Sequence, residues 1–385
     1  MRNGRIIIVG AGQAGISCAL ALREFGFSGD ATLLSDETHE PYDRPPLSKE
    51  LGGALSPIVK LDELNAKSIA LRLGAAGSAI NRASKTLTLN DGTALPYDSL
   101  VLATGGSARM LPSLTPDGHR VFVLRTLDDA RAIDRATQTT RNVLVLGGGW
   151  LGLESAAALR GRGCDVTLLE AAERLCARSV LAEISAYLHE MHTDRGVRIV
   201  TGAAAKVLTM SDGISARWNG VTTTFDMVVV AIGLAPHDML ARNAGLACDD
   251  GIVTDDLGRT DDPAIFAIGD VARIRTGSGT QRLESWKGAI AQGRRVAQAI
   301  CGVSVSPPEA PWFWSEQYDR LIQVAGLPHA GLTLLATETE PYPLWRYGAG
   351  GKIGAVIGVN RPRDLRQAHR TLSAVSAAAP FKVSI

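Results

Sequence analysis

Residues 5–37 read RIIIVGAGQAGISCALALREFGFSGDATLLSDE, and residues 142–173 read NVLVLGGGWLGLESAAALRGRGCDVTLLEAAE. The two stretches repeat one pattern. Each begins with a β-branched apolar run, passes through a glycine-rich turn into an Ala/Leu-rich helical segment, and ends in a second apolar run followed by acidic residues. This order predicts a strand, a helix and a second parallel strand, so the same βαβ unit occurs twice in the chain.

The turn of each unit carries glycines in the spacing G-x-G-x-x-G. They are Gly10, Gly12 and Gly15 in the first copy and Gly147, Gly149 and Gly152 in the second. Glycines at these places permit a tight turn and let the backbone approach a pyrophosphate, whose charge then lies at the N-terminus of the helix. The repeat therefore predicts two dinucleotide-binding sites.

An acidic residue follows the second strand of each unit, where it can accept hydrogen bonds from ribose hydroxyls. Asp36 or Glu37 takes this place in the first unit, and Glu170 takes it in the second. A carboxylate there favours a free ribose 2′-hydroxyl and repels a 2′-phosphate, so we expect the second site to prefer NADH to NADPH. Arg174 and Arg178 follow closely and oppose this preference.

A third apolar run, AIFAIGD at residues 264–270, decides which unit binds the longer ligand. The runs 98–109 (DSLVLATGGSAR) and 226–236 (DMVVVAIGLAP) close the two units, but the third run has no such counterpart. If it returns to the first unit, Gly269 and Asp270 reach a ligand lying across that unit, and Asp270 can accept hydrogen bonds from ribityl hydroxyls. The alternative role for Asp270 is a helix N-cap. We expect FAD in the first unit and NADH in the second.

The expected fold class is α/β, with two Rossmann-like domains and a small α+β domain at the C-terminal end. The NADH domain is inserted into the FAD domain. The expected boundaries are 1–112 with 246–305 for the FAD domain, 113–245 for the NADH domain and 306–385 for the third domain. Residues 304–311 (SVSPPEAP) have the composition of a linker. Beyond it we expect antiparallel strands at 322–325, 332–336 and 355–359, and a helix from about Arg363.

Composition excludes several other classes. Forty basic and thirty-nine acidic residues give a net charge of +1, which argues against a nucleic-acid or membrane binder. No apolar run reaches the roughly 20 residues that span a bilayer, and the start of the chain lacks a signal-peptide pattern. The five cysteines are scattered, which favours the cytoplasm and gives no metal site. His189 and His192 are expected to be surface histidines of an amphipathic helix.

Four segments together resemble one flavoprotein family. They are PYDRPPLSK at 41–49, FAIGD at 266–270, ESW at 284–286 and PWFWSEQY at 311–318. With the glycine motifs they are similar to the FAD-dependent ferredoxin reductases of Rieske-type aromatic-ring dioxygenases and some bacterial cytochromes P450. The resemblance covers essentially the whole chain. It implies an NADH:ferredoxin oxidoreductase of the glutathione-reductase-like fold.

The resemblance also implies a route for electrons and a partner. The electrons pass from NADH to FAD and then one at a time to a [2Fe–2S] ferredoxin, which feeds a terminal oxygenase of aromatic-compound degradation. This ferredoxin is either Rieske-type or plant- or adrenodoxin-like. The oligomeric state stays open between monomer and homodimer.

Individual residues receive roles from the resemblance as well. Arg44, Pro45 and Lys49 line the flavin, with Lys49 near its N5 edge, where a cation stabilises the reduced ring. Glu154 faces the nicotinamide. The residues expected at FAD are Gly10, Gly12, Ala14, Gly15, Asp36, Glu37, Arg44, Pro45, Lys49, Thr104, Gly105, Arg125, Gly269, Asp270, Glu284, Ser285 and Trp286. Those expected at NADH are Gly147, Gly148, Gly149, Leu151, Gly152, Glu154, Glu170, Arg178, Ile232 and Gly233.

Two tryptophans complete the expected catalytic set, which is Lys49, Glu154, Trp312 and Trp314. Trp312 and Trp314 occupy alternate positions of an extended segment, so both are expected to point to one side. The resemblance places at least one of them over the flavin or at the exit for electrons. The alternative is that both pack domains together.

Other functions remain as alternatives within this fold. A rubredoxin reductase or a flavin NADH oxidase shares the same motifs. An apoptosis-inducing-factor-like flavoprotein would be strongly basic, which the net charge of +1 disfavours. A disulfide oxidoreductase would carry a redox cysteine within residues 42–49, whereas no cysteine lies between Cys18 and Cys164.

A basic face on the C-terminal helix bears on the partner. Arg363, Arg366 and Arg370 fall at i, i+3 and i+7. They form either an ordinary solvated face or, together with Arg361, a docking surface for an acidic ferredoxin.

Overall fold

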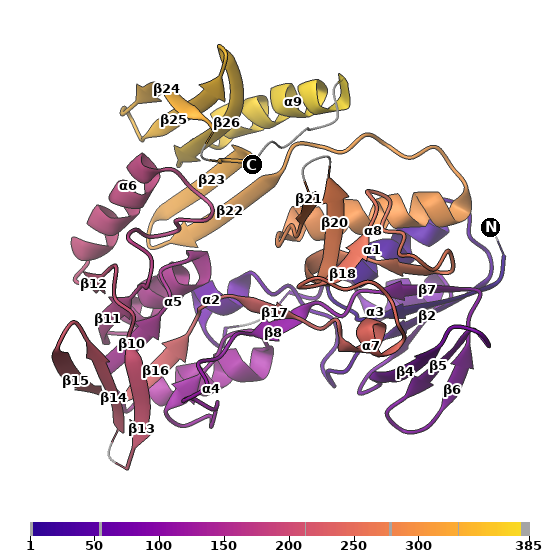
Figure 1. The fold of residues 1–385 in the computed structure, drawn as a ribbon, viewed down its shortest axis with the longest axis horizontal. Coiled ribbons are helices and arrows are strands. Elements are labelled where there is room, and N and C mark those ends of the chain that lie inside the picture. Colours follow the sequence, from indigo (N-terminus) through magenta and orange to yellow (C-terminus); the bar gives the residue numbers. More distant parts are fainter. Residues whose placement is uncertain (1–2, 54–55, 212, 277–278, 330, 379–385) are drawn as a thin grey trace.

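The computed structural model describes residues 3–53, 56–211, 213–276, 279–329 and 331–378, and side chains only to residue 375 within the last helix. The chain forms two α/β units and a third unit that packs against both (Figure 1). No helix within these ranges is both long and apolar enough to cross a membrane.

The first unit is built on a five-stranded parallel sheet of order β19-β7-β1-β2-β3. Its strands are β1 (Arg5–Val9), β2 (Asp30–Leu34), β3 (Ile69–Arg72), β7 (Ser99–Leu102) and β19 (Ile265–Ala267). The helices α1 (Gln13–Glu24) and α8 (Trp286–Cys301) pack against each other over this sheet (Figure 1). A Cβ on Gly293 would lie 2.6 Å from the carbonyl oxygen of Ala14, so glycine permits this close approach.

The second unit repeats the plan with a sheet of order β12-β11-β10-β16-β9. Its strands are β9 (Val121–Phe122), β10 (Asn142–Leu146), β11 (Asp165–Leu169), β12 (Arg198–Val200) and β16 (Met227–Val230). Its helices are α4 (Leu127–Thr137), α5 (Trp150–Gly161) and α6 (Ala182–Thr193). Because β1 pairs in parallel with β2 and β10 pairs in parallel with β11, the prediction of two βαβ units is confirmed.

The third apolar run does return to the first unit. β19 pairs in parallel with β7, and the whole second sheet lies between them in the sequence. The chain crosses between the units at β8 (Gly106–Ala108) and β17 (Leu234–Pro236), which pair antiparallel (Figure 1). We propose the boundaries 1–112 with 246–305, 113–245 and 306–385 for the three domains.

Smaller elements that sequence patterns did not predict decorate the two units. Two of them are antiparallel sheets, one of β4 (Gly77–Asn81), β5 (Thr86–Leu89) and β6 (Ala94–Pro96) and one of β13 (Lys206–Met210), β14 (Gly213–Trp218) and β15 (Val221–Phe225). A third, mixed sheet consists of β18 (Ile252–Thr254), β20 (Ala272–Thr276) and β21 (Gly279–Gln281). The short helices are α2 (Pro46–Glu50), α3 (Leu61–Ala66), α7 (Met239–Asn243) and the 3-10 turn η1 (Gly269–Val271).

The third unit is an antiparallel sheet of order β22-β23-β26-β25-β24 with one helix, as expected for a small α+β domain. Its elements are β22 (Trp312–Gln317), β23 (Arg320–Gly326), β24 (Thr333–Glu338), β25 (Leu344–Ala349), β26 (Lys352–Val359) and α9 (Pro362–Ala378). No sequence pattern predicted β25, although this strand lies inside the sheet. Its run LWRYGA mixes an arginine and a glycine with apolar residues and shows no period of two.

The expectation of two surface histidines on α6 is half wrong. His189 is exposed, but His192 is fully buried where α6 meets the third unit. A pattern on one helix could not reveal this, because the residues that bury His192 lie more than 120 positions away.

Candidate functional site

Each glycine turn is fixed by steric contacts that only glycine allows. Gly10 has φ +113°, and a Cβ there would lie 2.2 Å from the carbonyl oxygen of Ala103. Gly147 has φ +104°, and its Cβ would lie 2.3 Å from the carbonyl oxygen of Ala231. Side chains rarely adopt this backbone conformation, so the first glycine of each motif is needed by the protein itself.

The other two glycines of each motif differ in what surrounds them. A Cβ on Gly15 or Gly152 would lie 1.9 Å from the carbonyl oxygen of Gly10 or Gly147, so the third glycine lets helix and strand pack closely. A Cβ on Gly12 or Gly149 would meet no described atom within 4 Å. These middle glycines precede α1 and α5, and no described side chain caps either helix. Two helix N-termini with open N–H groups therefore fit two pyrophosphates.

The acidic residues after the second strands are not equivalent. Glu170 directly follows β11 and accepts hydrogen bonds from the backbone N–H groups of Gly148 (2.5 Å) and Ala172 (2.7 Å). Ser35 occupies the matching place after β2. In the first unit Glu37 is engaged within the protein, since its carboxylate accepts bonds from Tyr42 and Arg44, both at 2.6 Å. Asp36 is exposed, so of the two it is the acid that fits a ribose more simply.

Several residues predicted at FAD gather at the carboxyl end of the first sheet. Arg44 donates to the carbonyl oxygen of Arg125 at 2.7 Å, and Arg125 in turn donates to Asp270 at 3.1 Å. A Cβ on Gly105 would lie 3.1 Å from the Arg125 guanidinium. The contacts bring segments 42–50, 104–106, 125 and 269–271 to one place, as the returning strand predicts.

Asp270 does not cap the helix that follows it. It lies within η1, whereas α8 begins after Ser285, whose hydroxyl accepts a bond from the N–H of Gly288 at 3.0 Å. Gly269 has φ +75°, and a Cβ added to it would lie 2.9 Å from the Cβ of Ala14. Glycine therefore lets η1 approach α1 closely. The carboxylate of Asp270 is therefore left for Arg125 and for a ligand.

Several buried polar atoms near α1 and η1 have no hydrogen-bond partner among the residues the structure describes. They are Gln13 Oε1, Gln292 Nε2, and Nε and Nη1 of Arg282. Gln292 uses its Oε1 to accept from the N–H of Gly269 at 2.8 Å. Buried polar groups are nearly always hydrogen-bonded, so these atoms fit a polar ligand such as a dinucleotide bound beside α1 and η1.

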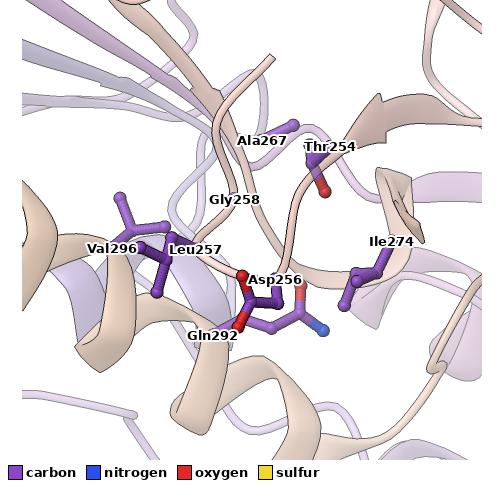
Figure 2. Close-up of a pocket in the computed structure, with 8 residues that line it drawn as sticks. All are labelled: Thr254, Asp256, Leu257, Gly258, Ala267, Ile274, Gln292 and Val296. Carbon is purple, nitrogen blue, oxygen red and sulfur yellow. The ribbon is translucent and has the colours of Figure 1, made fainter. Parts of the chain in front are cut away.

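A small pocket behind Gln292 is not the dinucleotide site. It is lined by Gln292 and Val296 of α8, Thr254 and Ile274 of the β18-β20 sheet, and the loop at residues 256–258 (Figure 2). None of the residues that line it is among those predicted at FAD or NADH.

Lys49 and Glu154 meet where α2 packs on α5. The ammonium of Lys49 lies 3.3 Å from Glu154 Oε2 and donates to the carbonyl oxygen of Pro45 at 3.0 Å. Ser48 donates to the same Glu154 oxygen, and Ser315 of β22 donates to Oε1 at 2.6 Å. The structure thus joins two residues predicted separately. Ser48 and Ser315 were missed, although both lie inside the quoted motifs.

Trp312 and Trp314 differ in what they contact: Trp312 lies in the core of the third unit, and Trp314 lies where the third unit meets the first. Trp312 is buried among apolar residues of the third unit and contacts His369 of α9 edge-on, with ring centroids 5.2 Å apart. Trp314 packs on the same side of β22 and meets Trp286 edge-on at 5.6 Å. Trp286 donates to Asp43 at 3.0 Å. Trp314 therefore reaches the segment predicted at the flavin. Trp312 packs mainly in the core of the third unit, although the ammonium of Lys287 on α8 lies over its ring at 5.1 Å.

Arg174 and Arg178, the two arginines expected near the second site, differ in their contacts. Arg174 donates to the carbonyl oxygens of Val180 (2.7 Å) and Ala177 (2.9 Å), so it serves the local fold. Arg178 is exposed, and its guanidinium lies 3.7 Å from the Cβ position of Gly233. Gly233 follows Ile232 after β16, and Leu151 in the first turn of α5 is exposed. Arg174 therefore cannot serve a 2′-phosphate without losing these bonds, whereas Arg178 is exposed and can still oppose the preference that Glu170 is expected to set.

Glu284 lies between the two units. It pairs with Arg282 at 2.7 Å. Burial raises the pKa of the Glu284 carboxyl; the Arg282 guanidinium opposes this shift, and the Asp270 carboxylate adds to it.

Two matching glycine turns, a returning strand with Asp270 and a Lys49–Glu154 pair that joins the two units define an oxidoreductase with two dinucleotide cofactors. Comparison with known proteins gives the family. The pyridine nucleotide-disulphide oxidoreductase profile matches residues 4–293, and a reductase C-terminal profile matches residues 312–383. The chain belongs to the pyridine nucleotide-disulphide oxidoreductase family, and its cofactors are FAD and NADH.

Individual relatives are similar over nearly their full length. The chain is 38% identical to rhodocoxin reductase of Rhodococcus erythropolis, covering 96% of this chain and 89% of that one. It is 36% identical to the ferredoxin–NAD(+) reductase component of the p-cumate 2,3-dioxygenase system of Pseudomonas putida, covering 99% and 96%. A crystal structure of a covalent putidaredoxin reductase–putidaredoxin complex matches with a TM-score of 0.90 at 35% identity, covering 96% and 93%.

Replacing Glu170 is expected to weaken the discrimination against NADPH. In Glu170→Ala the ratio of kcat/KM for NADH to that for NADPH should fall by about tenfold or more, because a carboxylate no longer repels the 2′-phosphate. Steady-state kinetics with both nucleotides measures the ratio. Glu173→Ala removes an exposed acid three positions further on and should leave the ratio unchanged. A ratio unaltered in Glu170→Ala would remove Glu170 from the ribose site.

Proposed function

We propose that this chain is an NADH-dependent ferredoxin reductase that supplies electrons to a terminal oxygenase of aromatic-compound degradation. FAD lies in the first unit, where Arg125 and Asp270 meet. NADH lies in the second unit, beside Glu170 and the first turn of α5. The flavin, when bound, accepts two electrons from NADH and releases them singly. The acceptor is a [2Fe–2S] ferredoxin of the Rieske type or of the plant or adrenodoxin type.

The Lys49–Glu154 pair carries this proposal. It joins α2 of the first unit, which carries Lys49, to α5 of the second unit, which carries Glu154. Lys49 lies in the segment where a disulfide oxidoreductase would bear its redox cysteine. A partly buried lysine there supplies positive charge without a protein nucleophile, so electrons leave for another molecule rather than for a disulfide of this chain. Two relatives support this direction of flow, since one is a rhodocoxin reductase and the other serves a dioxygenase system.

The residues around the pair divide the remaining work. Arg44 and Tyr42 hold Glu37 and fix the loop that leads into α2. Trp286 and Trp314 cover the junction of the first and third units with large apolar rings, which excludes water from that side. We propose the cytoplasm as the compartment, because the cysteines are spaced too irregularly for a disulfide framework.

Acceptor specificity tests this function. With NADH as donor, the purified protein should reduce a [2Fe–2S] ferredoxin much faster than a rubredoxin or oxygen. A rubredoxin reductase would instead reduce the rubredoxin fastest, and a flavin NADH oxidase would reduce oxygen fastest. Rapid peroxide formation without any carrier protein would overturn the proposal, and salt-sensitive binding to duplex DNA would favour the apoptosis-inducing-factor-like alternative.

Charge reversal on α9 is expected to slow the reaction with ferredoxin. Arg363, Arg366 and Arg370 are exposed and form no ion pair with a described residue. Arg361, expected in the same face, is instead engaged by Glu338 and Asp364, both at 2.7 Å. The double change Arg363→Glu/Arg366→Glu should lower the ferredoxin-dependent rate about tenfold at low salt, because steering of an acidic partner is lost.

The matched control for α9 is Arg131→Glu/Arg135→Glu, which reverses two exposed charges on α4. Ferricyanide reduction should be unchanged in both double variants, and the effect on ferredoxin should fade as salt rises. An equal loss in the two variants would show that α9 has no special part in docking.

A further inference from the structure

A line of buried polar side chains runs from Glu154 to Tyr318 at the edge of the third unit. Ser315 Oγ lies 2.6 Å from Glu154 Oε1, and Gln317 Nε2 lies 2.9 Å from Ser315 Oγ. His192 Nε2 lies 2.8 Å from Gln317 Oε1, and the Tyr318 hydroxyl lies 3.0 Å from His192 Nδ1. Ser315 and His192 are fully buried and Gln317 is 1% exposed, so water does not compete for these bonds.

The chemistry of one end fixes the direction of every bond. An ionised carboxylate only accepts, so Ser315 gives its single proton to Glu154 and must accept from Gln317. The Gln317 amide therefore turns its NH₂ to Ser315 and its oxygen to His192. His192 must then donate from Nε2, which leaves Nδ1 to accept from the Tyr318 hydroxyl. All four donors point toward Glu154.

The two titratable groups at the far end suit this arrangement. Burial lowers the pKa of His192 to about 4, so the ring is neutral near pH 7 and carries one N–H. Burial raises the pKa of Tyr318 to about 12, so its hydroxyl keeps its proton. The guanidinium of Arg195 lies over the Tyr318 ring, 4.6 Å from its centroid, and covers the outer end of this line of side chains.

We propose that Ser315, Gln317 and His192 are positioning residues that hold the Glu154 carboxylate as a hydrogen-bond acceptor aimed at Lys49. The proposal rests on the proposed function, in which Lys49 lies at the flavin. Aligned hydrogen bonds polarise one another and strengthen the last bond, which here falls on the charged group. Ser48 on α2 donates to the other oxygen, and no described side chain donates to Ser48 in turn.

This arrangement also joins three parts of the molecule at one carboxylate. Glu154 and His192 belong to the second unit, Ser315 and Gln317 to the third, and Ser48 to the first. A shift of β22 against α5 would break the bond to Glu154 before it breaks any backbone pairing. The orientation of Glu154 toward Lys49 thus depends on the third unit being docked.

The tautomer of His192 tests the proposal without any substitution. Nitrogen NMR of the FAD-loaded protein labelled with ¹⁵N-histidine should show His192 neutral, with its proton on Nε2. A protonated Glu154 would donate to Ser315 and reverse the line, which would place the His192 proton on Nδ1. That result would overturn the proposal.

Ser315→Ala removes the last donor and tests its effect on the reaction. Single-turnover reduction of the flavin by NADH should slow about tenfold, the scale of one charge-assisted hydrogen bond, while the Kd for NADH changes less than about twofold. The His192 signal should change from one tautomer to a mixture. Ser155→Ala is the matched control: this serine is buried next to Glu154 in α5, and its hydroxyl bonds the carbonyl oxygen of Leu151.

The outcomes separate this inference from the proposed function. If Ser315→Ala reduces the flavin at the rate of the unaltered protein, the positioning role is wrong, whatever the acceptor. If the unaltered protein fails to reduce any ferredoxin, the proposed function is wrong, and the His192 tautomer still decides the state of Glu154.

Discussion

Gly12→Ala is expected to abolish tight FAD binding while leaving the protein without FAD as stable as before. A Cβ at this position meets no described protein atom within 4 Å, so the fold itself tolerates alanine. The same methyl group projects into the space at the N-terminus of α1 where the pyrophosphate approaches the backbone. The Kd for FAD should rise about 100-fold or more, since several charge-assisted bonds of roughly 1.5 kcal/mol each are weakened together.

Gly15→Ala is the matched contrast within the same motif. Its Cβ would lie 1.9 Å from the carbonyl oxygen of Gly10, so the strand and helix must separate whether or not a ligand is present. We expect a loss of about 3 kcal/mol or more in unfolding free energy for the protein freed of FAD. Titration with FAD and urea unfolding of the apoprotein distinguish the two variants.

The second motif offers the same pair of changes as an internal repeat of the experiment. Gly149→Ala should weaken NADH binding without loss of stability, and Gly152→Ala should lower stability, because their Cβ positions match those of Gly12 and Gly15. FAD content should stay unchanged in Gly149→Ala. Loss of FAD from Gly149→Ala, or retention of normal FAD affinity by Gly12→Ala, would contradict the assignment of one cofactor to each turn.

The glycine turns could be predicted because their cause is local. The positive φ of Gly10 and the contact of Gly15 with the Gly10 carbonyl oxygen arise within one strand–turn–helix segment, so the spacing of the sequence records them directly. The contact of Gly10 with Ala103, which follows β7, is not local and could not be predicted in this way. The parallel sheets follow for the same reason, since each apolar run is buried on both faces. The insertion of one domain into the other was predictable from the single unmatched run that became β19.

The side-chain hydrogen bonds of the site could not be predicted, because they join residues that lie far apart in the sequence. Ser315 meets Glu154 across 161 positions, and His192 meets Gln317 across 125. A serine and a glutamine in a strand, or a histidine in a helix, have the same local pattern whether they face solvent or a buried carboxylate. The acid of the first unit was ambiguous for a related reason: the matching place holds Ser35, and only the bonds of Tyr42 and Arg44 show that Glu37 is occupied.

The name of the family and the chemistry of this chain also differ for a structural reason. The profile that matches residues 4–293 is named for disulphide reduction, whereas residues 46–50 form a helix that carries Lys49 in place of a redox cysteine. The scaffold brings two dinucleotides together and leaves the segment facing them free to vary. We therefore expect the residue on α2 to decide where the electrons go, which makes Lys49 the most informative position to change.

Lys49→Met is expected to lower both stability and the rate of flavin reduction, and a second substitution should separate the two effects. Glu154 is 7% exposed, so removing the ammonium leaves a buried carboxylate held by two serine hydroxyls alone. Breaking a buried ion pair costs about 3–5 kcal/mol in unfolding free energy, and the remaining hydroxyl donors place this case at the lower end. The single-turnover rate with NADH should fall about 100-fold, because a preorganised charge at the site of reduction is lost.

In the double variant Lys49→Met/Glu154→Gln, roughly 2 kcal/mol of the lost stability should return, because the unpaired charge is gone. The rate of flavin reduction should stay low, because no cation replaces Lys49. Arg82→Met breaks another partly buried ion pair of the first unit, that with Asp262 at 2.8 Å, and should lower stability without changing the rate. If the double variant recovers its rate together with its stability, Lys49 serves only to neutralise Glu154, and the cation at the flavin must come from another residue.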